Sequence, residues 1–300
     1  MKKTITFLFL LFCCTNAFSQ TGQLSDLKKK IQGIIDASNA DVGVAIKRLD
    51  ANDSIVINGS KHYPMQSVFK FPLALAVLDL VDKSKLSLGE NVRISRQSLD
   101  TNTFSPMLKD YPDKDPVEIT LSKLLIYSVS KSDNNACDAL FQLAGGTQHV
   151  NDFIHGLGIA GINIAATEGE MKRDWQIQYS NWCEPIAMLR LLQLFYEQKP
   201  VSRMNNFLLM RMMIESSNPD TRIKGLLPEK TVVAHKTGSS GTNSQGITAA
   251  VNDVGIVTLP DGKAFAIVVY VSNTTAKPEK SEHVIAEIAK AAWDYYTSQK

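Results

Sequence analysis

Segments with a strand pattern stand at both ends of the chain, and segments with a helix pattern stand between them. Residues 41–49 (DVGVAIKRL) and 53–59 (DSIVING) are apolar and flank a turn at 50–52, which predicts two strands. Three more strands are predicted over 231–240, 248–259 and 264–273, and the turn at 260–262 joins the last two as a hairpin. The simplest fold is therefore one antiparallel sheet assembled from both ends of the chain.

The helix pattern occupies the middle of the chain and its two flanks. Residues 24–39 and 282–296 have the apolar spacing of amphipathic helices, and the stretch from Ser67 to about Phe207 is mainly helical. We therefore predict an α/β (α+β) fold, with an antiparallel sheet flanked by the terminal helices and an inserted all-helical domain. Residues 20–62 and 214–300 are expected to form the α/β domain and residues 63–213 the helical domain, with a site in the cleft between them.

The first twenty residues have the features of a secretory signal peptide. Two lysines precede an apolar stretch from Ile5 to Cys14, and a small-residue site follows, which predicts a signal peptide over residues 1–19 and cleavage near Gln20. The apolar stretch is too short for a membrane anchor, and the bulky Phe12 disfavours lipid modification of Cys13. We expect a periplasmic protein without a membrane span, and a monomer because no sequence feature suggests an assembly surface.

Charge and ligand chemistry argue against two classes of partner. Loss of Lys2 and Lys3 on cleavage lowers the formal net charge from +2 to 0, and a neutral chain without a basic run is a poor binder of nucleic acid. The histidines form no H-x-H or H-x-x-x-H pair, so we expect no metal and no other cofactor. Cys137 and Cys183 either pair in an oxidising compartment or remain as buried thiols.

The first motif of catalytic type is Ser67 with Lys70. These residues stand three apart, so a helix places both side chains on one face. A serine hydroxyl becomes a good nucleophile when a neighbouring group takes its proton, and backbone N–H groups near a helix start can stabilise an oxyanion. Taken alone, the spacing is more often a helix cap followed by a solvated lysine.

Two more motifs follow along the chain. Ser132 and Asn134 flank an aspartate in the turn between two helices, where Ser132 can pass a proton to a leaving nitrogen and Asn134 can bind a substrate amide. Lys236 and Thr237 precede a glycine at the end of a strand, where they offer a charge and a hydroxyl to a substrate carboxylate. A glycine there would let a ligand approach the backbone. Each motif alone is also consistent with an ordinary polar turn.

The three motifs, in the order S-x-x-K, S-D-N and K-T-G, resemble those of class A β-lactamases and penicillin-binding proteins. Over its mature length the chain is similar to the class A serine β-lactamases. The segments TEGEMK, QYSNW, AHKTGSSGT, KGLLPE and NDVGIVTLPDG resemble their extended-spectrum cephalosporinase branch in Bacteroides and relatives. The resemblance implies a secreted hydrolase of β-lactam antibiotics, with cephalosporins favoured. It implies an acyl-enzyme on Ser67, formed when Lys70, Glu168 or both take the serine proton.

A β-lactamase also needs a carboxylate that activates water to release the acyl group. The class A pattern is Glu, two residues, an apolar residue and then usually Asn, and Glu168 fits it with Met171 at the apolar place. Glu170 does not fit, because Arg173 would stand there. Lys172 departs from the pattern, since the usual Asn helps to hold the water. Its side chain either takes over that hydrogen bond or points away.

The resemblance gives roles to five further residues. It implies that Asn181 helps to hold the loop around the base, and Asp138, where most class A enzymes have Asn, matches the same branch. Phe104 is implied as an aromatic wall at the cleft mouth, although a core position suits the sequence equally well. Ser239 is expected to give the second N–H of an oxyanion hole. Arg222 either adds positive charge for a substrate carboxylate or is a surface arginine.

Two other functions use the same motifs. A small DD-peptidase inhibited by β-lactams would lack the deacylating carboxylate, so Glu168 at the expected spacing argues against it. A non-enzymatic sensor or wall-binding domain normally has a membrane segment and would not need the complete set of catalytic residues, which are Ser67, Lys70, Ser132, Glu168 and Lys236.

Overall fold

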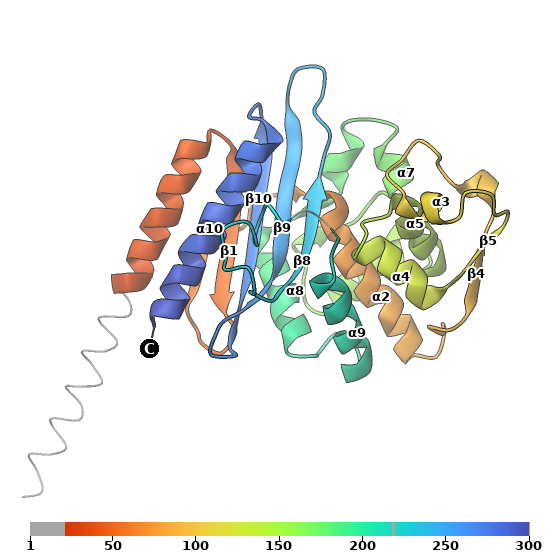
Figure 1. The fold of residues 1–300 in the computed structure, drawn as a ribbon, viewed down its shortest axis with the longest axis horizontal. Helices are drawn as coiled ribbons and strands as arrows, with labels where there is room; N and C mark the ends of the chain where they lie inside the picture. The colour runs from red at the N-terminus through yellow and green to blue at the C-terminus, as the bar shows by residue number, and fades with distance from the viewer. Residues whose placement is uncertain (1–21, 218–219, 300) are drawn as a thin grey trace, which may run out of the picture.

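The computed structural model describes residues 22–217 and 220–299, so the signal peptide expected over residues 1–19 lies outside the described residues. A five-stranded antiparallel sheet has the strand order β2-β1-β10-β9-β8 (Figure 1). Its strands are β1 (Asp41–Arg48), β2 (Ser54–Ile57), β8 (Val233–Ser239), β9 (Thr248–Thr258) and β10 (Ala264–Thr274). The pairing of β1 with β10 joins the two ends of the chain, which confirms the predicted sheet.

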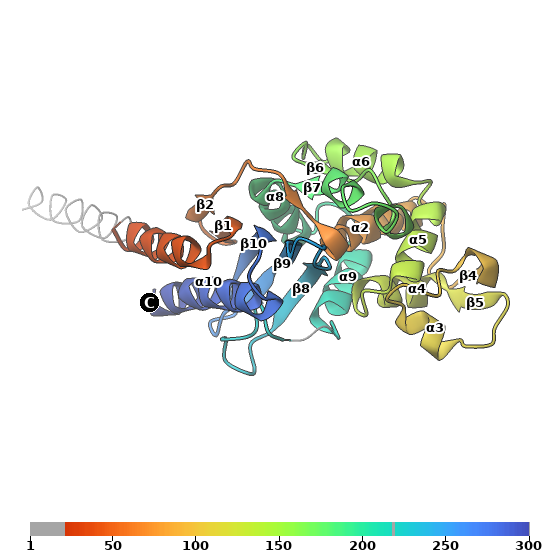
Figure 2. The same ribbon diagram turned by 90° about the horizontal axis from the view of Figure 1, so that it is seen from above.

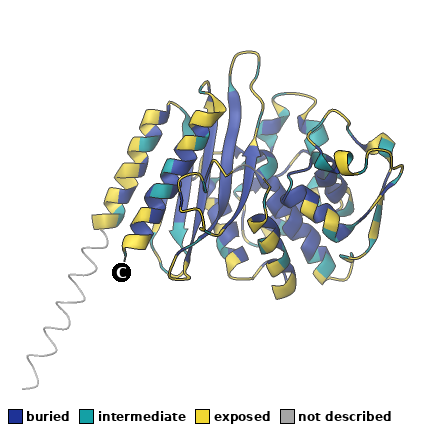
Figure 3. Cartoon of the chain, in the orientation of Figure 1, coloured by how far each residue is buried: buried dark blue, intermediate teal, exposed yellow. Residues whose placement is uncertain are grey.

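Both faces of this sheet are covered. Alternate residues of β10, such as Phe265 and Ile267, pack with the helix over residues 22–38 and with α10 (Pro278–Ser298). The residues between them, such as Ala266 and Val268, face the large core shared with the remaining helices. Because side chains alternate along a strand, a strand buried on both faces must be apolar throughout. This explains the unbroken apolar run at the start of β10, a strand that is buried along nearly its whole length (Figure 3).

The middle of the chain surrounds one helix that is buried on nearly all sides. Residues 70–78 of α2 (Lys70–Asp82) are all buried, as expected for a helix that is apolar around its circumference. It follows directly from the short 3₁₀ helix η1 (Gln66–Phe69). The other long helices of this region are α4 (Leu121–Val129), α5 (Asn134–Leu143), α6 (Thr147–Gly156), α8 (Pro185–Tyr196) and α9 (Arg203–Ile214).

The inserted region also contains short elements that the helix pattern does not indicate. Strands β4 (Asn91–Ile94) and β5 (Val117–Thr120) pair with each other inside the stretch expected to be mainly helical, and α4 begins only at Leu121. A second small sheet contains β3 (Tyr63–Pro64), β6 (Ile162–Asn163) and β7 (Trp182–Cys183). The short helices are α3 (Pro106–Asp110), α7 (Glu168–Met171), η2 (Arg96–Ser98) and η3 (Ile177–Ser180).

The helix over residues 22–38 and α10 run side by side on the same face of the sheet (Figures 1 and 2). The Gln299 side chain donates a 2.7 Å hydrogen bond to that of Gln23, so the two ends of the described chain touch. Within residues 22–217 and 220–299, no helix is long and apolar enough to cross a membrane, and no cluster of His, Cys, Asp and Glu could hold a metal. Cys137 and Cys183 are free and buried thiols.

Candidate active site

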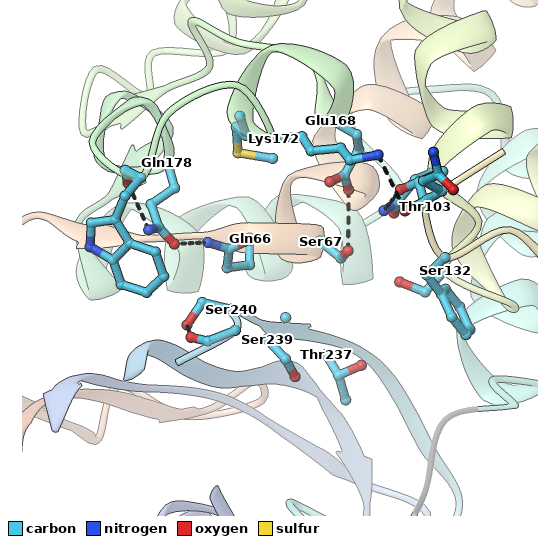
Figure 4. A pocket seen from close by; sticks show the side chains of 17 residues that line it. Gln66, Ser67, Thr103, Ser132, Glu168, Lys172, Gln178, Thr237, Ser239 and Ser240 are labelled. Carbon is cyan, nitrogen blue, oxygen red and sulfur yellow. Dashed lines mark hydrogen bonds between the residues drawn. The ribbon is translucent and has the colours of Figure 1, made fainter. Parts of the chain in front are cut away.

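A cleft of about 630 Å³ lies between β8 and the segment that follows α7, and it contains residues from all three motifs (Figure 4). Its size is typical of a small-molecule site. The lining residues are Gln66, Ser67, Asn102, Thr103, Phe104, Ser132, Asn134, Glu168, Met171, Lys172, Trp175, Gln178, Thr237, Gly238, Ser239, Ser240 and Gly241.

Ser67 lies on η1, directly after a residue with strained backbone. Gln66 has φ +49°, a region that a non-glycine residue enters at a cost of about 1 kcal/mol or more. Its side chain is fixed by a hydrogen bond to Gln178, which in turn donates to the carbonyl of Trp175. Ser67 Oγ donates a 3.3 Å hydrogen bond to Glu168 Oε1, and Figure 4 shows the two side chains pointing toward each other. The strained turn therefore presents the hydroxyl to a carboxylate.

Lys70 is completely buried at the first residue of α2. Its ammonium nitrogen contacts the carbonyl of Ser132 at 2.8 Å, Asn134 Oδ1 at 2.7 Å and Glu168 Oε1 at 2.8 Å. The same Glu168 oxygen therefore faces both Ser67 and Lys70. The sequence places Ser67 and Lys70 on one face, and the structure joins them through a shared carboxylate.

The S-D-N motif stands in the turn between α4 and α5. Ser132 has φ +55°, a second strained position beside the cleft. The next residue, Asp133, caps α5 by accepting the Ala136 N–H at 2.8 Å, so the capping role expected of a polar turn is also present. Asn134 Nδ2 donates to Thr103 Oγ1 at 2.8 Å, which fixes the side chain against the opposite loop.

Lys236 is completely buried on β8, and its ammonium nitrogen lies 2.9 Å from Ser132 Oγ. Burial, together with the charge of Lys70, lowers the pKa of Lys236 to about 7. The glycine of this motif serves packing: a Cβ on Gly238 would lie 2.4 Å from the carbonyl oxygen of Met65. Gly238 also lines the cleft, and its expected role in letting a ligand approach the backbone stays a prediction.

Arg222 is not a surface arginine, so that alternative is wrong. Its side chain is 8% exposed and lies behind β8, where it donates to the carbonyls of Gly238 at 3.1 Å and Asn252 at 2.7 Å. It also donates to Ser239 Oγ at 2.6 Å and pairs with Glu282 of α10 at 3.1 Å. Arg222 therefore contacts the cleft wall through the hydroxyl of Ser239, which lines the cleft.

Glu168 is the first residue of the one-turn helix α7. The Asp138 carboxylate accepts the N–H groups of Glu168 and Gly169, each at 2.8 Å, which fixes the start of the helix. Burial raises the pKa of Asp138 to about 6 against these two hydrogen bonds. The side chain of Glu170 forms a capping box with Thr167. Of the two glutamates, Glu168 faces Ser67, in agreement with the sequence pattern.

Asn181 lies under the same loop and is completely buried. Its Oδ1 accepts the N–H groups of Ala165 and Ala166, and its Nδ2 donates to the Ala166 carbonyl at 2.7 Å. This places it where the resemblance implies. Phe104 is 60% exposed and lines the cleft, so the alternative of a core position is wrong.

Lys172 points away from Glu168. Its ammonium nitrogen lies 2.5 Å from Asp100 Oδ2 and 3.2 Å from the Asn102 carbonyl, on the other side of the cleft rim. The structure therefore supports the alternative in which the Lys172 side chain points away from the base, and not the one in which it takes over the hydrogen bond of the usual Asn.

Several lining residues were not anticipated from the sequence. They are Gln66, Asn102, Thr103, Trp175, Gln178 and Ser240. Gln66, Asn102, Thr103 and Ser240 stand within two residues of a site residue predicted from the sequence, which was the available signal. Trp175 and Gln178 reach the cleft through the tertiary fold, which no local pattern reports.

Comparison with known proteins identifies the family. The model of the β-lactamase enzyme family matches residues 26–296. The chain is 40% identical to the β-lactamase VEB-1 of Pseudomonas aeruginosa, over 100% of this chain and 99% of the relative. A crystal structure of the TLA-1 extended-spectrum β-lactamase is 47% identical, with a TM-score of 0.89 over 91% of this chain and 99% of that one. A class A β-lactamase from Bacteroides cellulosilyticus is 37% identical, with a TM-score of 0.85 over 91% and 99%. The chain therefore belongs to the β-lactamase enzyme family, within class A.

Proposed function

We propose that this class A β-lactamase is a secreted serine enzyme that opens β-lactams through an acyl-enzyme on Ser67 and releases the product with water activated by Glu168. The observation that carries the proposal is the position of Glu168 Oε1, which lies 3.3 Å from Ser67 Oγ and 2.8 Å from Lys70 Nζ. A nucleophile and a proton acceptor in direct contact are the parts that acyl transfer needs.

In the acylation step, Ser67 Oγ attacks the lactam carbonyl carbon and its proton passes to Glu168, to Lys70 or through both. The N–H groups of Ser67 and Ser239 stabilise the oxyanion. The lactam C–N bond then breaks, and the departing nitrogen takes a proton from Ser132. Ser132 regains a proton from the group that accepted the Ser67 proton, so the Ser67 proton ends, in effect, on the nitrogen. The ammonium of Lys236 lies 2.9 Å from Ser132 Oγ and fixes that hydroxyl in place.

In the deacylation step, Glu168 takes a proton from a water molecule, whose oxygen attacks the ester carbonyl. The ester bond breaks and the proton returns to Ser67 Oγ, so the enzyme is restored. Substrate binding is assigned to Asn134 for the side-chain amide and to Thr237 and Ser239 for the carboxylate. Arg222 supports Ser239, and Phe104 forms the aromatic wall.

We propose cephalosporins as the favoured substrates, as the sequence resemblance implies. We include extended-spectrum β-lactams because the TLA-1 relative is described as an extended-spectrum β-lactamase. We also propose that the mature enzyme is a periplasmic monomer, and that residues 63–213 form a helical domain inserted into an α/β domain. Mass spectrometry of protein from the periplasmic fraction should give a mature chain that begins near Gln20.

The test is turnover of a chromogenic cephalosporin by the purified mature protein. The wild type should complete many turnovers, Ser67→Ala should give none, and Glu168→Gln should give one burst and then stall. Glu118→Gln, an exposed glutamate of β5, is the control and should match the wild type. Rapid steady-state turnover by Glu168→Gln would contradict the assignment of the base. A wild type that stops after one equivalent would favour a penicillin-binding peptidase instead.

A further inference from the structure

Lys172 is coupled to Glu168 through the backbone. It caps the C-terminal end of α7, and its N–H donates a 3.2 Å hydrogen bond to the Glu168 carbonyl. Its side chain extends in the opposite direction and ends at Asp100 and Asn102. The position of the Lys172 side chain therefore affects the position of the Glu168 backbone. The Lys172 ammonium group itself does not contact the Glu168 carboxylate.

Asp100 is a fixed partner for this lysine. Its N–H donates to Asn135 Oδ1 at 2.8 Å, and Asn135 Nδ2 donates back to its carbonyl at 3.0 Å. Asn135 is buried on α5, next to Asn134, which binds Lys70. The hydrogen bond from Lys172, with that from the backbone N–H of Asn102, lowers the pKa of Asp100 and so favours its carboxylate form.

The helix α7 needs such external contacts because it has only four residues. A single helical turn is not stable by itself in water. Asp138 holds the start of α7, and Asn181 contacts Met171 near its end through a 3.3 Å hydrogen bond to the sulfur. Lys172, at the end of α7, adds a third support. Among these three it is the one that is ionic and that reaches residues 100–104.

We propose that the Lys172–Asp100 ion pair positions Glu168 for deacylation by tying the end of α7 to the opposite rim of the cleft. The inference rests on the proposed function of Glu168. Lys172 is then a positioning residue that does not contact the hydrolytic water. Because reaction rates respond steeply to small displacements of a catalytic group, losing the pair should slow deacylation without unfolding the protein.

The two side chains are 46% and 33% exposed, so the pair itself adds little to stability. Thermal unfolding of the variants should therefore stay close to that of the wild type. The pair Lys290–Asp294 on α10 is a matched control, with a 2.6 Å contact and exposures of 41% and 47%, on the helix behind the sheet.

The experiment separates acylation from deacylation with a chromogenic cephalosporin, by stopped-flow measurement of the burst and mass spectrometry of the quenched acyl-enzyme. Lys172→Met and Asp100→Asn should each slow deacylation on the order of tenfold and leave acylation within about threefold. The double variant should be no slower than either single variant, because both remove one interaction. Lys172→Arg should retain most of the rate, and Lys290→Met with Asp294→Asn should change neither step.

Three results would overturn the inference while the wild type still turns over. Asp100→Asn could deacylate at the wild-type rate, which would mean that Lys172 acts without Asp100. The two single effects could multiply in the double variant, which would mean that they are independent. All variants could deacylate normally. A wild type without a second turnover would instead refute the proposed function of Glu168, and this inference would fall with it.

Discussion

The ammonium nitrogen of Lys236 lies 2.9 Å from Ser132 Oγ, and both side chains are buried beside the cleft. Lys236 also donates to its neighbouring carbonyl, that of Thr237, at 3.0 Å. A protonated Lys236 donates a hydrogen bond to the Ser132 hydroxyl oxygen. The hydroxyl proton of Ser132 then points elsewhere and is available for a substrate nitrogen. This contact makes the protonation state of Lys236 important for both binding and proton delivery.

The first prediction concerns pH. Burial and the charge of Lys70 lower the pKa of Lys236 to about 7, so the lysine is charged below that pH and loses its charge above it. We expect kcat/KM for a carboxylate-bearing β-lactam to fall above about pH 7, mainly through KM. Lys236→Arg should shift the fall to higher pH, because guanidinium keeps its charge. A wild-type profile that stays flat to pH 9 would contradict this.

The second prediction concerns Asp138. Burial raises its folded pKa from 3.8 to about 6, so the folded protein binds more protons than the unfolded chain between these values. The contribution of this residue to stability therefore decreases as pH rises from about 4 to about 6. Asp138→Asn removes this titration. The difference in free energy of unfolding, variant minus wild type, should therefore increase by about 2–3 kcal/mol from pH 4 to pH 7. Urea unfolding at each pH measures this difference. If the stability of the two proteins changed with pH in parallel, the titration of Asp138 would not be the cause of the pH dependence.

The third prediction concerns Asn181. Asn181→Ala removes the acceptor for the N–H groups of Ala165 and Ala166 and leaves both without that partner. We expect a loss of about 2–4 kcal/mol in the free energy of unfolding, together with slower deacylation. Asn206→Ala is the control, because Asn206 is buried and donates to the Phe195 carbonyl away from the cleft. The control should lose stability and keep its deacylation rate, and equal kinetic losses would refute the assignment.

The fourth prediction concerns Gly238. A methyl group there meets the Met65 carbonyl at 2.4 Å, so Gly238→Ala must push β8 away from η1. We expect a loss of about 1–3 kcal/mol in stability and a large loss of acylation, because Ser67 and Ser239 would no longer share one oxyanion hole. Gly89→Ala, where no atom lies within 4 Å of the added carbon, should be neutral in both assays. Normal acylation by Gly238→Ala would show that β8 can move without effect.

The elements predicted best from the sequence were those with strong periodicity. The β9–β10 hairpin and the helix α10 have long apolar patterns, and the structure places them as expected. The strands β4 and β5 were missed because four residues with exposed polar positions have too little apolar character to distinguish them from loop or helix.

In the site, too, the residues in local motifs were predicted and the contacts between distant segments were not. Ser67, Lys70, Ser132 and Lys236 stand in short motifs with fixed spacing, and the structure brings them together. The contacts that support them depend on the tertiary fold. Lys172 and Asp100 are 72 residues apart, and Gln66 is separated from its partner by 112. A single sequence contains no local pattern for such pairs, because nothing in the sequence around either residue identifies its distant partner.

The contact between Gln23 and Gln299 has a consequence for engineering. Both ends of the described chain lie on the outer face of the sheet, behind the strands that border the cleft (Figure 2). A short peptide could therefore join them, and new termini could be opened at the exposed turn around Asp261 without crossing the substrate path. The same geometry would let the enzyme be fused or immobilised through either end, with its cleft left open to solution.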